Sequence, residues 1–302
     1  MCLPVEDWPA RSRLVILPPR RPVDLLASYW TLAVGSVPHS DREFSTASFN
    51  ERVACAARAG FTGFGIRYAD LEYTLRTQSL GDTRGVLDDH GMRHVELEFL
   101  LDWWVTDGEK KAVCDDRKRF LFEAAAALGA RHIKVGDFSN TPCQMPQLIN
   151  SFARLCAEAK EYGTAILFEP MPFSYVHSLE GALELVAGAD APNGGIIFDL
   201  WHVVKLGIPY ADVARVPKRF LRGIELNDGT FSAPWDMVED TLNHRRLCGE
   251  GEFDVKGFVK MLLEAGYDGP WGIEVPNREM RTWDADVLAQ RASATARAQF
   301  PG

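Results

Sequence analysis

The sequence predicts an α/β protein, a single parallel (β/α)8 TIM barrel, from three observations. Short apolar runs alternate with longer amphipathic runs along most of the 302 residues. The alternation repeats at about 30 residues per unit, the length of one strand and its helix. Several long runs end in a glycine just before the next apolar run, which is typical of a helix end. A doubly wound open sheet is the competing fold, but no GxGxxG follows the first apolar run.

The short runs are rich in Ile, Val, Phe and Leu, as expected for strands that are buried on both faces. The predicted strands cover residues 29–34, 63–67, 94–100, 132–137, 165–169, 195–199, 221–226 and 271–275. The predicted helices cover residues 50–58, 109–128, 145–162, 179–187, 255–265 and 284–296. Glycines 60, 129, 163 and 266 are the expected stops.

The first part of the chain differs in composition from the rest. Residues 1–26 are rich in Pro and Arg, so we expect a short irregular N-terminal arm there. Residues 27–302 then form one barrel domain, close to the usual size of about 250 residues.

Composition and charge exclude several classes of protein. Lys and Arg number 33 against 42 Asp and Glu, and the net charge of −9 argues against a nucleic-acid partner. The sequence contains no apolar run of about 18 residues, so no membrane span is expected, and the N-terminus lacks the pattern of a secretory signal. The six cysteines form no CxxC pair, so reduced thiols and a cytoplasmic location are expected.

Each of the last four predicted strands ends in one acidic residue, namely Glu169, Asp199, Glu225 and Glu274. Active sites of parallel barrels are built at these carboxyl ends. A single such acid is best read as a strand-end salt bridge. Four of them converging on an apolar barrel need a positive partner, because unpaired buried carboxylates are costly. Oxygen ligands of this kind favour one Mg²⁺ or Mn²⁺ ion over Zn²⁺ or Co²⁺.

The chain from about residue 28 onward resembles the xylose isomerase-like TIM barrels, which include sugar phosphate isomerases and epimerases, ketose 3-epimerases, and inosose and dehydroshikimate dehydratases. The resemblance rests on the following motifs: Phe168-Glu169-Pro170, Asp199-Leu200-Trp201-His202, Glu225-Leu226-Asn227-Asp228, Gly249-Glu250-Gly251-Glu252-Phe253-Asp254, and the run from Gly266 to Glu274.

The resemblance implies that the four strand-end residues bind one divalent metal ion and that Glu169 and Glu274 also transfer protons. Glu225 departs from the family, which usually has His at this position, and the substitution makes the site all-carboxylate. The family's epimerases carry an Arg shortly before the Gly-x-Gly loop, and Arg245 or Arg246 matches it here.

Further residues are candidates for substrate binding. His202 lies three residues after Asp199 and is expected to contact substrate, although a helix-capping role fits its spacing equally well. Trp201 is one of several aromatic residues in predicted loops that could form an apolar wall. Arg245 and Arg246 could bind a phosphate, although surface arginines are as common. Lys134 on the fourth strand is expected to pair with Glu96 or Glu98 inside the barrel, in a structural role.

We therefore interpret the chain as a divalent-metal-dependent sugar or sugar phosphate isomerase or epimerase that removes a proton next to a carbonyl through an enediolate. The expected binding partner is a small polyol or sugar as substrate. The sequence leaves open whether the protein forms a homo-oligomer. One alternative is a metal-dependent dehydratase acting on a keto-polyol. A more remote one is a barrel that binds a polyol without catalysis. An abasic-site endonuclease shares this barrel, but it needs a His-rich zinc cluster and a basic face, which the sequence lacks.

Overall fold

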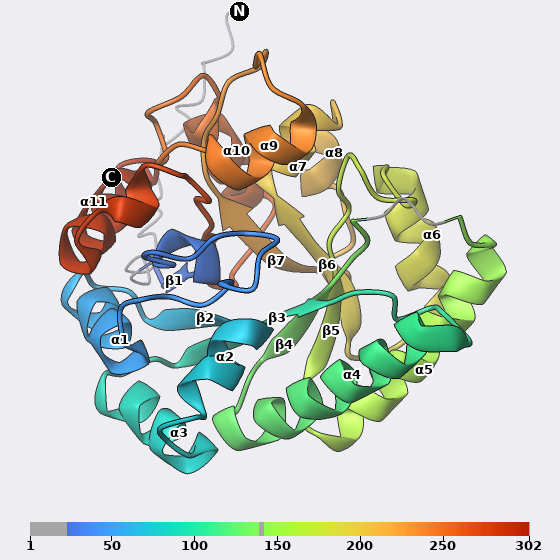
Figure 1. Cartoon of the computed structure of the whole chain (residues 1–302). Helices are drawn as coiled ribbons and strands as arrows, with labels where there is room; N and C mark the ends of the chain where they lie inside the picture. The colour runs from blue at the N-terminus through green and yellow to red at the C-terminus, as the bar shows by residue number, and fades with distance from the viewer. Residues whose placement is uncertain (1–22, 139–141, 302) are drawn as a thin grey trace, which may run out of the picture.

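The computed structural model describes residues 23–138 and 142–301 and shows the predicted TIM barrel. Eight parallel strands follow one another in chain order, and β1 pairs with both β2 and β8 to close the barrel (Figure 1). The strands are β1 Leu25–Ala27, β2 Gly63–Arg67, β3 His94–Leu100, β4 His132–Val135, β5 Ala165–Phe168, β6 Gly194–Asp199, β7 Leu221–Leu226 and β8 Trp271–Ile273.

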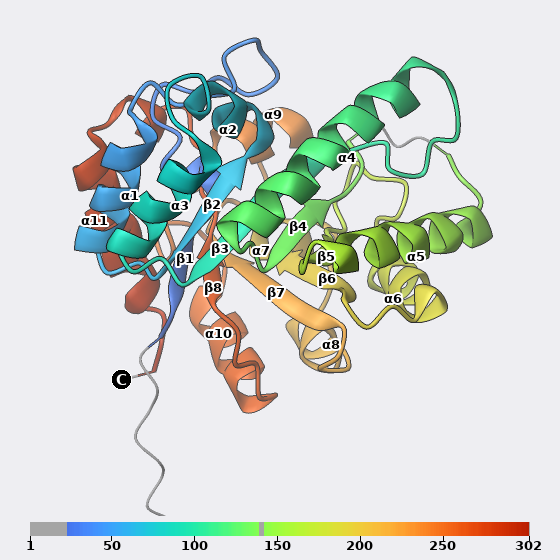
Figure 2. The ribbon, with the colours of Figure 1, turned by 90° about the horizontal axis from the view of Figure 1, so that it is seen from below.

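Helices surround the strands and cover their outer faces, as Figure 2 shows for α3, α4 and α5 outside β2 to β5. The α-helices are α1 Phe49–Arg58, α2 Tyr68–Thr74, α3 Leu80–Asp89, α4 Gly108–Leu128, α5 Met145–Glu161, α6 Leu179–Ala189, α7 Leu200–Lys205, α8 Tyr210–Ala214, α9 Met237–Asn243, α10 Val255–Glu264 and α11 Ala285–Arg297. Within the described ranges, no helix has the length and apolar character needed to cross a membrane.

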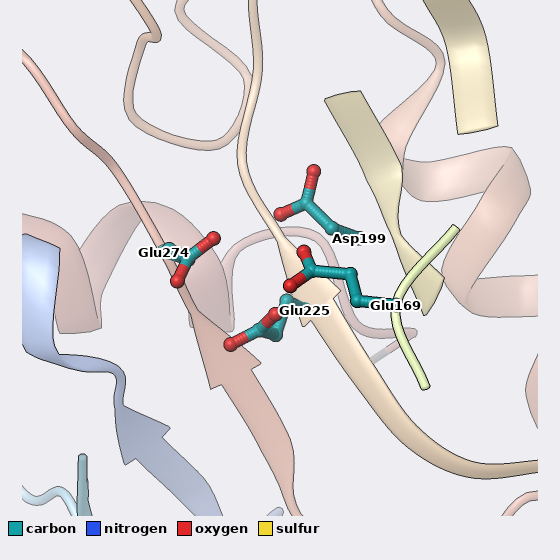
Figure 3. A group of neighbouring side chains, drawn as sticks. All are labelled: Glu169, Asp199, Glu225 and Glu274. Atoms are coloured by element: carbon teal, nitrogen blue, oxygen red, sulfur yellow. The ribbon is translucent and has the colours of Figure 1, made fainter. Parts of the chain in front are cut away.

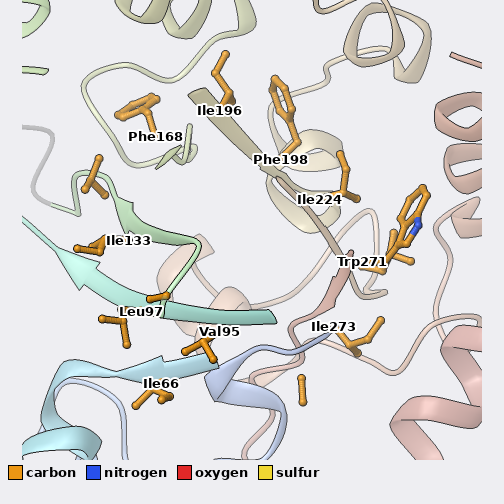
Figure 4. Close-up of a cluster of buried hydrophobic side chains, with 14 of the residues drawn as sticks. Ile66, Val95, Leu97, Ile133, Phe168, Ile196, Phe198, Ile224, Trp271 and Ile273 are labelled. Carbon is orange, nitrogen blue, oxygen red and sulfur yellow. The ribbon is translucent and has the colours of Figure 1, made fainter. Parts of the chain in front are cut away.

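Side chains along each strand alternate between the barrel interior and the helices. On β3, Val95 and Leu97 join the apolar layer between strands and helices, where Ile133 and Ile196 also lie (Figure 4). The intervening residues Glu96 and Glu98 are buried as well. The barrel therefore has an apolar outer shell and a polar interior near its carboxyl end.

Local signals explain where the helices begin and end. Ser48 accepts a hydrogen bond from the Glu51 backbone N–H at the start of α1, which satisfies a free donor of the first turn. Gly129 follows α4 with φ of +63°, a left-handed conformation that L side chains avoid. Glycines 60, 163 and 266 have the same conformation at the other predicted stops, so these predicted helix ends are confirmed.

The predicted first strand is wrong. The strand lies at Leu25–Ala27, where Leu25 pairs with Trp271, and Tyr29–Thr31 forms a 3₁₀ helix at the barrel mouth. The apolar run at 29–34 suggested a strand. Its residues Tyr29 and Trp30 are buried, but they form a small separate cluster with Ala33. Most of the expected N-terminal arm, residues 1–22, lies outside the described residues, and β1 begins at Leu25, within the range of 1–26 that was expected for the arm.

Candidate active site

Four buried carboxylates converge at the carboxyl end of the barrel (Figure 3). Asp199 is the last residue of β6, and Glu225 is the second-last residue of β7. Glu169 and Glu274 directly follow β5 and β8. One oxygen from each of these residues lies within 4.8 Å of the others. The structure thus brings together all four acids that the sequence singled out.

Lys134 supplies positive charge to this cluster from β4. Its ammonium lies 2.6 Å from Glu98 Oε2 and 2.8 Å from Oε1 of both Glu225 and Glu274. The expected pairing of Lys134 with a strand-three Glu is therefore confirmed, and it extends to two of the four strand-end acids. Ser28 Oγ also donates to Glu225 Oε1, at 2.8 Å.

Arg245 contacts two of the four acids, Asp199 and Glu274. Its guanidinium donates to Asp199 Oδ2 at 2.8 Å and to Glu274 Oε2 at 3.3 Å. Thr241 Oγ1 accepts from Nε and Nη2, which fixes the plane of the guanidinium. Asn227 donates to the same Asp199 oxygen at 2.5 Å. Every guanidinium nitrogen of Arg245 therefore has a partner within the protein.

His202 lies beside the acids because Asp199 caps α7. The Asp199 side chain accepts a hydrogen bond from the His202 backbone N–H, and the ring then faces the cluster. His202 Nε2 is 3.3 Å from Arg245 Nη2 and 3.4 Å from Glu169 Oε1. Burial lowers the pKa of His202 to about 3, so its imidazole is neutral at ordinary pH.

The pKa values of the acids differ although all are buried. Burial raises the pKa of both Glu98 and Glu169 to about 7, and it raises that of Glu225 well above its ordinary value. Burial also acts on Glu274, but the positive charges of Lys134 and Arg245 outweigh it, and the pKa falls. Lys134 and Arg245 therefore do not suffice to keep Glu98 and the four strand-end acids all ionised.

The donor set of the cluster fits a divalent ion. Carboxylate oxygens at opposite corners of a six-coordinate ion lie about 4–5 Å apart, which matches the 4.8 Å spread. Glu225 Oε2 is buried without a hydrogen-bond partner among the described residues, an arrangement that is costly unless a cation satisfies it. The residues present are thus suited to hold a hard metal ion.

A pocket lined by polar and aromatic side chains opens next to the cluster. Its polar lining includes Glu169, Glu274, Lys134, His202 and Arg245. The remaining wall is largely apolar and includes Trp30, Phe99, Phe138, Met171, Phe173 and Pro276. Arg67 also lines the pocket and is paired with Glu43 Oε2 at 2.7 Å. Each of the three cations on the described wall is therefore already matched by a carboxylate.

Two of the predicted substrate contacts do not lie on this pocket. Arg246 is exposed and donates to the backbone of Glu250. Trp201 is fully buried beneath Arg245, whose guanidinium lies 5.4 Å from the indole ring. Their roles stay predictions, and Trp201 is placed to support Arg245. Glu98 was not singled out as a site residue, although its two-residue spacing from Glu96 places both on the inner face.

Together with the four strand-end acids, the barrel defines the class of protein. Residues 53–298 match the model of the xylose isomerase-like TIM barrel family, and the chain belongs to this family.

Two 3-dehydroshikimate dehydratases of Pseudomonas are similar to the chain in sequence. A 3-dehydroshikimate dehydratase of Pseudomonas aeruginosa is 27% identical over 234 residues, which cover 76% of this chain and 36% of that protein. The chain thus spans about a third of the length of the curated relatives it matches.

Solved structures share the fold. The crystal structure of the protein IolI with a bound zinc atom superposes with a TM-score of 0.79 at 18% identity, over 92% of this chain and 98% of that one. D-allulose 3-epimerase from Methylomonas sp., in complex with D-allulose, gives a TM-score of 0.69 at 19% identity, over 92% and 97%.

Proposed function

We propose that the protein is a divalent-metal-dependent isomerase or epimerase that removes a proton next to the carbonyl of a keto-polyol. The observation that carries the proposal is that Glu169 and Glu274 line one pocket from different strands, within a cluster suited to a metal ion. Two carboxyl groups facing one substrate are what proton removal and return require.

The surroundings of the two residues suggest different roles. Glu274 accepts hydrogen bonds from Lys134 and Arg245, which favour its ionised form, so we assign it as the base. Glu169 forms no ion pair with a described lysine or arginine and lies 3.4 Å from His202, so we assign it as the second group, which returns the proton. A divalent ion, held by Glu169, Asp199, Glu225 and Glu274, would supply the Lewis acidity that acidifies the C–H bond next to the carbonyl.

The wall of the pocket favours a neutral polyol as substrate. Arg67, Lys134 and Arg245 are all paired with carboxylates, so none offers an unpaired charge to a phosphate. The aromatic rings of Phe138 and Phe173 stack with their centroids 5.1 Å apart and offer an apolar face to a carbon skeleton. We also propose that the protein is cytoplasmic and has no membrane partner. The net charge of −9 argues against a nucleic-acid partner.

Dehydration is the second candidate function, and it is favoured by the likeness to the Pseudomonas dehydratases. Removal of the same proton by Glu274 begins this reaction too. A hydroxyl on the next carbon then leaves as water, with Glu169 as the proton donor. The two functions differ in whether the proton returns to carbon or the hydroxyl departs.

Hydrogen exchange with solvent tests both functions. The protein with Mn²⁺ is incubated in heavy water with a panel of ketoses, inososes and 3-dehydroshikimate, and products are followed by NMR and mass spectrometry. Deuterium at the carbon next to the carbonyl of an epimer or isomer supports the first function, and loss of water supports the second. If a polyol binds but neither exchange nor loss of water occurs, the barrel binds without catalysis, and the proposal fails.

A further inference from the structure

The position of Lys134 has a consequence for metal binding. We propose that Lys134 is an internal competitor of the divalent ion, and that it keeps the affinity of the carboxylate cluster for metal low. The inference rests on the metal binding contained in the proposed function, and it concerns a residue that we assign no part in proton transfer.

All three N–H donors of Lys134 are used by carboxylates. An ammonium group has three N–H donors, and three carboxylate oxygens lie within 2.8 Å of Nζ, one each from Glu98, Glu225 and Glu274. The side chain is 1% exposed and starts from the middle of β4, so no loop movement can withdraw it. No N–H remains for a substrate oxygen, and Lys134 is therefore a positioning residue.

Its contacts are made with the same residues that a metal ion needs. Oxygen Oε1 of Glu225 already accepts hydrogen bonds from Lys134 and Ser28, and Oε1 of Glu274 accepts one from Lys134. Glu225 Oε2 is the oxygen of that residue left without a partner among the described residues. A divalent ion must share these carboxylates with the ammonium, and two like charges at such short range repel each other strongly inside a protein.

Lys134 also offsets part of the cost of burying the cluster. Three buried carboxylates with no cation would be strongly destabilising, and one ammonium offsets part of that cost. The charge that offsets this cost therefore also weakens metal binding. We infer that the metal ion is exchangeable and not permanently held.

Titration of Mn²⁺ into metal-free protein tests the inference without measuring activity. Chelator-stripped wild type, Lys134→Met, Lys134→Gln and Lys205→Met are compared by isothermal calorimetry and by the EPR signal of free Mn²⁺. Lys205 is the matched control, because it is a largely buried lysine paired with Asp240 at 2.9 Å and makes no ion pair with the cluster. We expect both Lys134 variants to bind Mn²⁺ at least tenfold more tightly than wild type, and Lys205→Met to bind within twofold of it.

The outcomes separate this inference from the proposed function. Equal or weaker binding by both Lys134 variants overturns the competition but leaves a metal-dependent enzyme intact. Absence of Mn²⁺ binding in every variant overturns the metal site itself and the proposed function with it. If Lys134→Met does not fold without metal, the test rests on Lys134→Gln, which retains N–H donors without the charge, and on its melting temperature with and without Mn²⁺. A larger rise in melting temperature with Mn²⁺ than wild type shows then supports the inference, and an equal rise overturns it.

Discussion

Glu169 and Glu274 carry the same functional group in unlike surroundings. Glu274 contacts both Lys134 and Arg245, whereas Glu169 forms no ion pair with a described lysine or arginine and lies 3.4 Å from the neutral ring of His202. Burial acts on both, so the difference between their pKa values comes from the neighbouring cations. The sequence predicted both residues but not this asymmetry, because Lys134 and Arg245 are distant along the chain.

Replacing either glutamate by glutamine tests the assignment of acid and base. We expect Glu169→Gln and Glu274→Gln each to lower kcat by about a hundredfold or more, the usual scale for a lost acid or base. Steady-state kinetics on the active substrate, with the metal content of each variant measured, checks this. Glu250→Gln is the control, since Glu250 lies on the surface and pairs with Arg291. Full activity in either site variant would remove that residue from proton transfer.

His202 is placed to contact substrate, since it lines the pocket and is neutral. We expect His202→Asn to raise KM by about tenfold with a smaller loss in kcat, because it removes a contact made equally before and during the reaction. Comparison of kcat and KM with those of wild type checks this. A fall in kcat as deep as that of the glutamate variants, with metal still bound, would instead make His202 a proton carrier.

At the scale of elements, the segment after β7 positions Arg245. Asp228 at its start accepts hydrogen bonds from the backbone N–H groups of Gly229, Gly249 and Phe253. The backbones of Asp228 and Arg246 also pair as an antiparallel bridge. These contacts join the two ends of the segment and hold Arg245 over Asp199.

Gly251 is required by the close approach of this segment to itself. A Cβ there would lie 2.3 Å from Asp228 Oδ1 and 2.4 Å from Gly229 O, too close for any side chain. We expect Gly251→Ala to destabilise the protein by about 1–3 kcal/mol, as overpacked substitutions do. Gly85→Ala is the control, because a Cβ at Gly85 in α3 meets no atom within 4 Å. It should stabilise by about 0.5–1 kcal/mol. Urea denaturation measures both, and equal stabilities would show that the segment is loose.

The sequence predicted these elements unevenly. Strands with strong apolar runs were placed within one or two residues, and 221–226 coincides with β7. The first strand was missed because three residues, Leu25–Ala27, carry little periodic signal beside the longer apolar run that follows. The strand-end acids could be found because their place in each repeat is regular. Contacts such as Lys134 with Glu225, 91 residues apart, depend on closure of the barrel and leave no local pattern.

At the scale of the molecule, the cluster joins half of the barrel. Its four acids come from β5, β6, β7 and β8, so a bound ion would link all four strands. We expect chelation to lower the melting temperature and Mn²⁺ to restore it. At a concentration one hundred times its Kd, Mn²⁺ should raise the free energy of unfolding by about 2.7 kcal/mol. Differential scanning calorimetry with and without Mn²⁺ measures this. Identical melting curves would count against a metal site at the cluster.

In the metal-free protein, Glu98 and Glu169 contribute stability that falls as the pH rises from about 4.5 to about 7. Glu98 and Glu169 have folded-state pKa values of about 7, above the ordinary value of 4.5, so the folded state binds their protons more tightly than the unfolded state. That stabilisation is complete below pH 4.5 and is lost as the pH rises through 7. Denaturation at a series of pH values measures it, and Glu98→Gln should flatten the profile. The difference between the wild-type and Glu98→Gln profiles isolates Glu98, and two parallel profiles would contradict its raised pKa.

The bond between Lys134 on β4 and Glu225 on β7 also constrains how such a sequence can change over time. Loss of the lysine alone leaves a carboxylate buried without its cation, and loss of the glutamate alone shifts the ammonium onto its remaining partners. The two losses are coupled, because the residues are in direct contact, so losing both costs less than the sum of the two single losses. Among descendants of this chain, positions 134 and 225 should therefore be inherited as a pair. A hybrid barrel that joins β1–β4 of one relative to β5–β8 of another keeps its core only if both halves bring matching residues at these two places.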